Sequence, residues 1–270
     1  MAGLTRVPLI AGNWKMNLDH LQSIAFVQKL AWTLQDARHD FGAKGSEVAV
    51  FPPFTDLRSV QTLIAADKLA LVYGAQDLSE HDSGAYTGEI SGAFLKALKC
   101  RYVIVGHSER RTLHGETDEQ VGRKVAAAIK NDLIPIICVG ETAEDLEKHG
   151  PSAVPVAQLR SALEGLAALT GAKEPNIVVA YEPVWAIGSG QAATAEQAEQ
   201  VAVRLRETLG EVLGEGVAEA TRILYGGSVK SGNIAGFMRE ANVDGALVGG
   251  ASLDVAEFSS IARFQKHVGT

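Results

Sequence analysis

The length of 270 residues allows one large domain or two small ones, and either arrangement can bury a sizeable core. Hydrophobic residues make up 46% and charged residues 21%, which excludes a disordered or fibrous chain. The formal net charge of −7, without a block of Lys or Arg, argues against nucleic acid or an anionic membrane as a partner. An anionic ligand would therefore need a locally positive site.

The cysteines and the apolar runs bear on the compartment. Cys100 and Cys138 lie in or beside apolar runs and lack the spacing of a disulfide framework or a zinc site. The apolar stretches are shorter than the roughly 18 residues of a membrane helix, and the N-terminus lacks a signal-peptide core. We therefore expect a cytoplasmic protein with no membrane association.

Eight short runs rich in Val, Ile and Leu predict eight strands. In chain order they span residues 7–12, 47–52, 69–75, 102–107, 133–140, 176–183, 221–228 and 244–250. The runs are almost wholly apolar, which is typical of parallel strands buried on both faces. Pro135 removes a ladder donor, but it lies near the start of its run, where a sheet tolerates proline.

Amphipathic stretches separate most of these runs, and the clearest predict helices at 19–37, 118–133 and 194–213. Thr194, with Gln197 three residues later, is a plausible cap for the last of these. No Pro/Gly/Ser-rich linker interrupts the serial order, so we expect one domain over residues 1–270. Eight such units favour an α/β fold in which eight parallel strands close into a (β/α)8 barrel surrounded by helices.

In such a barrel the carboxyl ends of all strands open onto one face, where distant residues can meet one ligand. Polar residues and glycines gather at or just after the ends of the expected strands: Asn13, Lys15, Gln76, His107, Glu182, residues 226–228 and Gly249–Gly250.

Glu182 lies near the end of the sixth run and is followed by the glycine-containing segment PVWAIGSGQAAT. A loop that closes over a carboxylate strips its hydration and makes it a stronger base, suited to taking a proton from carbon. The alternative interpretation is a surface glutamate before a proline turn.

His107 is the last residue of the fourth run and precedes Ser108 and Glu109, which favour the start of a helical turn. Backbone N–H groups there disfavour positive charge, so we expect a neutral imidazole that donates to a carbonyl oxygen. The alternative is a strand-end histidine bound to a backbone carbonyl. The seven histidines show no paired spacing with carboxylates, so we expect no metal site.

Lys15 and Asn13 follow the first run, where a cation and an amide donor would face an anionic substrate. A solvated loop lysine is the alternative for Lys15.

Three glycine-containing loops, at 186–190, 225–228 and 248–253, predict a phosphate site, because glycines let backbone N–H groups approach phosphate. Each glycine pair alone is also generic turn chemistry.

Two further features are less specific. Cys138 lies in an apolar run, which indicates a packed core thiol. The segment 76–92 is long for a loop and carries Tyr86, Thr87 and Glu89, so it is either functional or an interface.

Five motifs together resemble the triosephosphate isomerase family over essentially the whole chain. They are AGNWKMN at 11–17, VGHSERR at 105–111, AYEPVWAIGSG at 180–190, YGGSV at 225–229 and VGGASL at 248–253. The resemblance implies a (β/α)8 TIM barrel that needs no cofactor. It also implies interconversion of dihydroxyacetone phosphate and D-glyceraldehyde 3-phosphate through an enediolate, in glycolysis and gluconeogenesis.

The resemblance also implies roles for individual residues. It makes Glu182 the base, His107 the electrophile, Lys15 the electrostatic partner of phosphate and enediolate, and Asn13 a ligand of the reacting oxygens. Ser108 and Glu109 would support the catalytic side chains without contacting the substrate. The phosphate would be held by Gly188, Ser228, Gly249 and Gly250. The lid would comprise Trp185, Ala186, Ile187, Gly188, Ser189 and Gly190.

Members of the family are homodimers in which the loop after the third strand inserts into the partner. The resemblance therefore places Gln76, Thr87 and Arg110 at or near an interface. Two alternatives remain: another phosphate-binding barrel, such as a sugar-phosphate epimerase or phosphoribosyl isomerase, and a non-catalytic barrel that serves as a binding protein.

Overall fold

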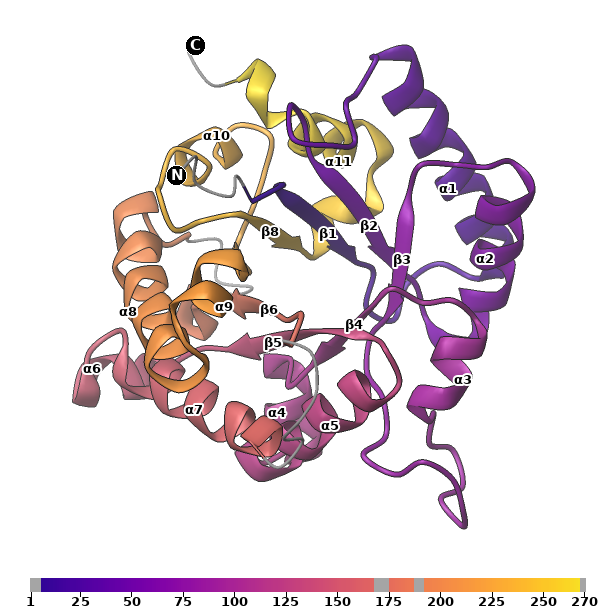
Figure 1. Cartoon of the computed structure of the whole chain (residues 1–270). Coiled ribbons are helices and arrows are strands. Elements are labelled where there is room, and N and C mark those ends of the chain that lie inside the picture. The colour runs from indigo at the N-terminus through magenta and orange to yellow at the C-terminus, as the bar shows by residue number, and fades with distance from the viewer. Residues whose placement is uncertain (1–5, 168–174, 187–191, 268–270) are drawn as a thin grey trace.

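Eight parallel strands form a closed barrel in which each strand pairs with the next and β8 returns to β1. The computed structural model describes residues 6–167, 175–186 and 192–267. In Figure 1 the strands lie at the centre and the helices surround them. The strands are β1 (Leu9–Asn13), β2 (Glu47–Phe51), β3 (Val72–Ala75), β4 (Tyr102–Val105), β5 (Ile134–Val139), β6 (Val178–Tyr181), β7 (Arg222–Tyr225) and β8 (Gly245–Val248).

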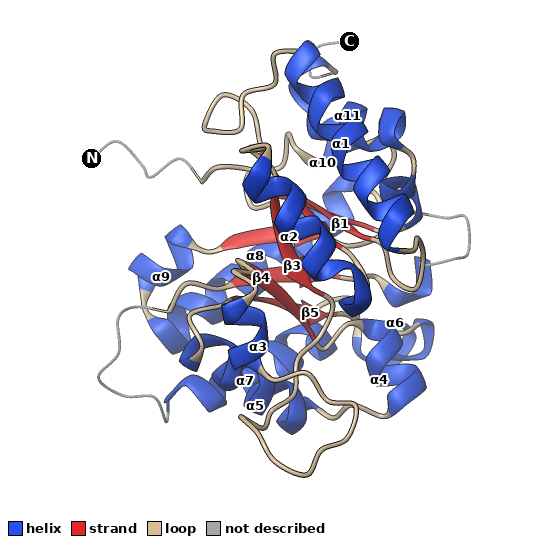
Figure 2. Ribbon diagram, turned by 90° about the vertical axis from the view of Figure 1, so that its right-hand side faces the viewer, coloured by secondary structure: helices blue, strands red, loops and turns tan. Residues whose placement is uncertain are grey.

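Helices follow the strands and cover the outside of the barrel, as the second view shows (Figure 2). The α-helices are α1 (His20–Asp36), α2 (Leu57–Ala66), α3 (Gly92–Ala97), α4 (Ser108–His114), α5 (Asp118–Lys130), α6 (Ala143–His149), α7 (Ala153–Ala167), α8 (Ala195–Leu213), α9 (Glu215–Ala220), α10 (Ile234–Phe237) and α11 (Val255–Ala262). Four 3-10 helices are η1 (Phe54–Asp56), η2 (Val184–Ala186), η3 (Gly250–Leu253) and η4 (Phe264–Lys266) within the described residues.

Helix α8 begins where its sequence predicts. The Thr194 side chain accepts a hydrogen bond from the Gln197 backbone N–H, and the Gln197 side chain accepts one from the Thr194 N–H. This capping box satisfies two of the N–H groups that a helix start leaves without intrahelical partners. The cap therefore fixes where the chain after residue 191 turns into the outer helical ring.

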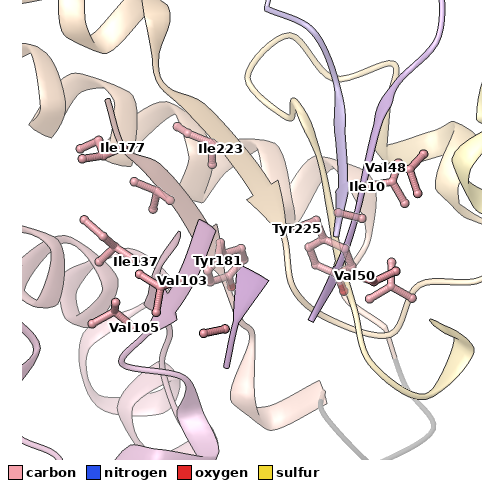
Figure 3. Close-up of a cluster of buried hydrophobic side chains, with 14 of the residues drawn as sticks. Ile10, Val48, Val50, Val103, Val105, Ile137, Ile177, Tyr181, Ile223 and Tyr225 are labelled. Atoms are coloured by element: carbon pink, nitrogen blue, oxygen red, sulfur yellow. The ribbon is translucent and has the colours of Figure 1, made fainter. Parts of the chain in front are cut away.

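Alternation along each strand divides the core into two parts. One set of side chains, including Ile10, Val50 and Val103, packs between the strands and the helices (Figure 3). The other set, including Leu9 and Ala11, forms a separate buried cluster. Because side chains of one strand face alternate sides, Asn13 lies on the same side as Leu9 and Ala11. The separate cluster therefore fills the barrel interior and ends at a polar layer.

Glycine is needed where β8 closes the barrel against β1. Gly245 has a φ of +148°, and a Cβ placed on it would collide with the carbonyl oxygen of Leu9. Only a residue without a Cβ fits this backbone approach without displacement.

The predicted fold class is confirmed. Each strand lies within or overlaps the corresponding apolar run, and Pro135 occupies the second position of β5, as expected. Among the helices of the described residues, none is long and apolar enough to cross a membrane.

Candidate active site

A cavity of about 420 Å³ opens at the carboxyl ends of the strands. Its walls come from the carboxyl ends of β1 and β8 and from the segments after β1, β4, β6, β7 and β8, so residues far apart in sequence meet there as the barrel predicts. The residues that line it are Asn13, Lys15, His107, Glu109, Glu182, Gly226, Gly227, Ser228, Val229, Lys230, Leu247, Gly249, Gly250 and Ala251.

Glu182 is buried, so the interpretation of a surface glutamate is wrong. Its backbone N–H donates to the carbonyl of Val139 at 2.8 Å, which extends the β6 ladder by one residue. The alternation that sends Ala180 into the barrel interior therefore sends the Glu182 carboxylate there too. A base placed on a strand end in this way has little freedom apart from its own side-chain rotation.

The Glu182 carboxylate has three polar contacts. Oε2 accepts a hydrogen bond from the Ser108 backbone N–H at 3.0 Å, and Oε1 accepts one from the Ser108 hydroxyl at 3.3 Å. His107 Nε2 lies 3.0 Å from Oε1. The carboxylate is thus held against the start of α4 on one side of the cavity.

His107 is the N-cap of α4, and its ring is fixed from both sides. The Glu109 backbone N–H donates to Nδ1 at 3.2 Å, so Nδ1 acts as an acceptor and carries no proton in this contact. Nε2 then carries the proton and faces the cavity and Glu182. Among the described contacts this nitrogen meets a carboxylate, so the interpretation of a histidine that binds a backbone carbonyl is wrong.

The two side chains shift each other's pKa. Burial alone would raise the pKa of Glu182, but the adjacent His107 and the Ser108 N–H outweigh it and lower the pKa below the ordinary value of 4.5. Burial lowers the pKa of His107, but the Glu182 carboxylate outweighs it and raises the pKa. The lowered Glu182 pKa differs from the stronger base expected from the sequence, because the carboxylate contacts His107 directly.

Lys15 and Asn13 are fixed at the end of β1. Lys15 has a φ of +54°, in the left-handed region, and two hydrogen bonds hold it there. Its N–H donates to Asn13 Oδ1 at 3.0 Å, and its carbonyl accepts from Gln76 Nε2 at 2.8 Å. Asn13 Oδ1 is therefore engaged, and Nδ2 is the donor end of this amide, whose residue lines the cavity.

The Lys15 ammonium group forms an ion pair with Glu109 at the cavity wall, so Lys15 is not a lysine surrounded only by solvent. Glu109 lines the cavity itself, whereas the resemblance implied that it only supports the residues that do. This carboxylate partly neutralises the cation that would meet an anionic substrate.

Glycine-rich loops form another part of the cavity wall. Gly226, Ser228, Gly249 and Gly250 line the cavity where the chain leaves β7 and β8. A Cβ on Gly226 would lie 2.9 Å from Glu182 Cγ, so glycine leaves room for the base. Such a wall presents backbone rather than side chains, as phosphate binding requires.

Two residues of this region were missed by the sequence analysis. Lys230 lines the cavity, and its place one residue after the YGGSV motif was an available signal. Glu141 is buried and accepts hydrogen bonds at Oε1 from the Tyr181 hydroxyl at 2.8 Å and from Trp185 Nε1 at 2.7 Å. Only the folded barrel brings Glu141 to the segment that follows Glu182.

Part of the expected lid lies outside the described residues: Ile187, Gly188, Ser189 and Gly190. Trp185 and Ala186 are described and belong to η2, which begins directly after Pro183. Glu141 therefore anchors the first turn of the expected lid through Trp185.

The expected interface residues have different surroundings. Gln76 is half-buried and donates to the carbonyls of Lys15 and Phe51, both at 2.8 Å. Thr87 is exposed on the segment between β3 and α3. Arg110 forms ion pairs with Glu116 and with Asp77, the latter at 2.9 Å. Gln76 thus also supports the backbone of Lys15.

Cys138 is a buried residue of β5 that belongs to the interior cluster, as its sequence context predicts. Burial raises the pKa of its thiol, and the nearby Glu182 carboxylate raises it further, so the group stays protonated. In the described part of the chain, no three His, Cys, Asp or Glu side chains are grouped so as to hold a metal ion.

Known proteins resemble the chain over nearly all of its length. A family model described as triosephosphate isomerase matches residues 8–265. A triosephosphate isomerase of Leifsonia xyli subsp. xyli is 76% identical over 98% of this chain and 100% of the relative. Those of Streptomyces coelicolor and Mycobacterium ulcerans are 55% and 54% identical over 97% and 96% of this chain and 98% and 97% of theirs. The chain belongs to the triosephosphate isomerase family, an enzyme family of isomerases.

Proposed function

We propose that this chain interconverts dihydroxyacetone phosphate and D-glyceraldehyde 3-phosphate by proton transfer through an enediolate. The observation that carries the proposal is the pairing of a buried carboxylate with an imidazole N–H, 3.0 Å apart, at the wall of a cavity that also holds Lys15. We place this reaction in cytoplasmic glycolysis and gluconeogenesis, and we treat the whole chain as one catalytic domain without a cofactor.

Glu182 acts as the base. Its hydrogen bonds to Ser108 hold it beside the cavity, so side-chain rotation away from Ser108 and His107 brings it to the substrate carbon. Leaving His107 removes the main interaction that lowers its pKa, whereas burial, which raises it, remains. The carboxylate therefore becomes a stronger base as it reaches the reacting carbon.

His107 acts as the electrophile in its neutral form. Its Nδ1 is occupied by the Glu109 N–H, so Nε2–H is the donor available to the substrate oxygens. The carboxylate that raises the pKa of His107 is Glu182, and this interaction weakens when Glu182 rotates away. The remaining burial favours the uncharged ring, which can polarise a carbonyl oxygen and pass a proton between two oxygens.

Lys15 and Asn13 stabilise negative charge that develops on the substrate oxygens. The ammonium group of Lys15 lies at the cavity wall, and Asn13 Nδ2 is the amide end that can donate there. Donors fixed before the reaction need no reorganisation when the enediolate forms. The two hydrogen bonds that hold the Lys15 backbone keep this cation in position.

The phosphate binds to Ser228, Gly249 and Gly250, together with Gly188, which lies outside the described residues. A lid over residues 185–190 then closes and excludes water, which protects the enediolate from losing phosphate. The hydrogen bond from Trp185 to Glu141 fixes the first residue of this lid to the barrel.

We also propose a homodimer whose interface includes Gln76, Thr87 and Arg110. Supporting this, the segment between β3 and α3 projects Tyr86, which is 45% exposed, and stacks it on His81 with ring centroids 3.8 Å apart. A loop that exposes an aromatic side chain in this way suits insertion into a partner.

The test is isomerisation of D-glyceraldehyde 3-phosphate by the purified protein and by Glu182→Gln, which keeps the shape of the side chain and removes the base. We expect rapid turnover by the unmodified protein and a loss of kcat of at least roughly 100-fold in the variant. Epimerisation of other sugar phosphates serves as the comparison. An unmodified protein without isomerase activity would refute the proposal and favour an epimerase or a non-catalytic binding protein.

A further inference from the structure

Lys230 cancels an excess negative charge among the charged side chains at the cavity wall. Glu109 and Glu182 contribute two carboxylates, and Lys15 and Lys230 contribute two ammonium groups. His107 is neutral in the form that carries out the reaction. Without Lys230 the described wall would carry an excess negative charge, on a chain whose net charge is already −7. A phosphate dianion would then be repelled from the cavity at long range.

The two lysines differ in their partners. Lys15 is paired with Glu109. For Lys230, no carboxylate oxygen among the residues that the structure describes lies within ion-pair distance of Nζ. Glu257, a carboxylate near this loop, is engaged by Ser231 through the backbone N–H at 2.7 Å and the hydroxyl at 2.9 Å. Among the described residues, Lys230 therefore forms no ion pair that would hold its ammonium group away from the cavity.

The backbone of Lys230 is nevertheless held in place. Its backbone N–H donates a hydrogen bond to Asn233 Oδ1 at 2.8 Å. Its carbonyl accepts hydrogen bonds from the Asn233 and Ile234 N–H groups at 3.1 and 3.0 Å. Lys230 is exposed, and its backbone near Ser228 is fixed. Rotation about the bonds of its flexible side chain can therefore bring the ammonium group to the cavity mouth.

We propose that Lys230 attracts the phosphate of the substrate and holds it at the cavity mouth, without taking part in proton transfer. This inference rests on the proposed function, because it assigns a charge to the phosphate end of that substrate. A residue with this role affects substrate encounter and KM and leaves kcat nearly unchanged.

The experiment compares Lys230→Gln with Lys29→Gln, an exposed lysine of α1 that makes the same change in net charge away from the cavity. At an ionic strength of about 0.02 M we expect Lys230→Gln to lose about three- to tenfold in kcat/KM, mainly through KM. At about 0.5 M, where the Debye length falls to about 4 Å, most of the loss should disappear. Lys230→Arg should restore the value, and Lys29→Gln should not change it.

Inorganic phosphate is the probe that separates this inference from the proposed function. Its dissociation constant should rise about three- to tenfold in Lys230→Gln at low ionic strength and should not change in Lys29→Gln. If the unmodified protein binds phosphate in this way but does not isomerise triose phosphates, the proposed function fails and the role of Lys230 in phosphate binding stands. Equal phosphate affinity in Lys230→Gln and the unmodified protein, or a loss that persists at high salt, would overturn the inference.

Discussion

Replacing Tyr181 by Phe should destabilise the protein by an amount that depends on pH. The Tyr181 hydroxyl donates to the buried Glu141 carboxylate at 2.8 Å. A hydrogen bond to a charged group contributes about 1.5–3 kcal/mol, and one to a neutral group about 0.5–1.5 kcal/mol. We therefore expect a loss of about 1.5–3 kcal/mol in unfolding free energy where Glu141 is ionised and about half of that where it is protonated.

The direction in which stability changes with pH follows from the pKa of Glu141. Burial raises this pKa above the ordinary value of 4.5, and the hydrogen bonds from Tyr181 and Trp185 oppose the increase. A raised pKa in the folded state means that stability decreases as pH rises through it. Tyr181→Phe removes an interaction that favours the charged form, so it raises the pKa further and makes this decrease steeper.

The assay is urea unfolding at fixed protein concentration, at pH values of about 8 and about 4.5. Tyr225→Phe on the neighbouring strand is the matched control, because the Tyr225 hydroxyl accepts from the Ala193 N–H at 3.1 Å and meets no carboxylate in the described contacts. Its effect should be the same at both pH values. A Tyr181→Phe effect that is equally independent of pH, or that persists unchanged in a Glu141→Gln background, would refute the reasoning.

Three further predictions concern the cavity. His107→Gln should lower kcat by roughly 10²- to 10³-fold with little change in KM, because a donor to the developing oxyanion is lost; steady-state kinetics will check this. Gly226→Ala places a Cβ 2.9 Å from Glu182 Cγ, so kcat should fall at least about tenfold while circular dichroism stays unchanged. The lowered pKa of Glu182 contributes stability above its ordinary value of 4.5 that is lost as pH falls through the folded-state pKa. Glu182→Gln should therefore flatten the acid side of the curve of unfolding free energy against pH.

The fold was predictable because its signals are local and repeated. Eight apolar runs separated by amphipathic stretches indicate a parallel sheet covered by helices, and eight units favour closure into a barrel. The Thr194–Gln197 cap was readable from four residues of sequence, and the same box occurs in the structure. Such features depend on spacing that the sequence displays directly.

The sequence predicted which residues form the candidate site, but it predicted less well which of them contact one another. Strand-end positions brought Asn13, Lys15, His107 and Glu182 to one cavity, as expected. Their pairing was not predicted, because it depends on side-chain rotamers and on distances between strands. The lowered pKa of Glu182 follows from a 3.0 Å contact with His107, which no sequence pattern contains.

Glu141 shows what local patterns cannot provide. It follows β5, whereas its partners Tyr181 and Trp185 follow some 40 residues later on the next strand and its loop. In the sequence, a carboxylate after an apolar run looks like any loop residue. Only the folded barrel brings it within hydrogen-bond distance of these two donors. Lys230 differs, because its charge beside a phosphate-type loop was visible in the sequence and was overlooked.

The most direct measurement of proton transfer by Glu182 is deuterium incorporation from D₂O into dihydroxyacetone phosphate during turnover. The unmodified protein should label the carbon next to the carbonyl, because the base takes up a proton from that carbon and returns one that has exchanged with solvent. Glu182→Gln should label it at least roughly 100-fold more slowly. Labelling by this variant at the rate of the unmodified protein would contradict the assignment of Glu182 as the base.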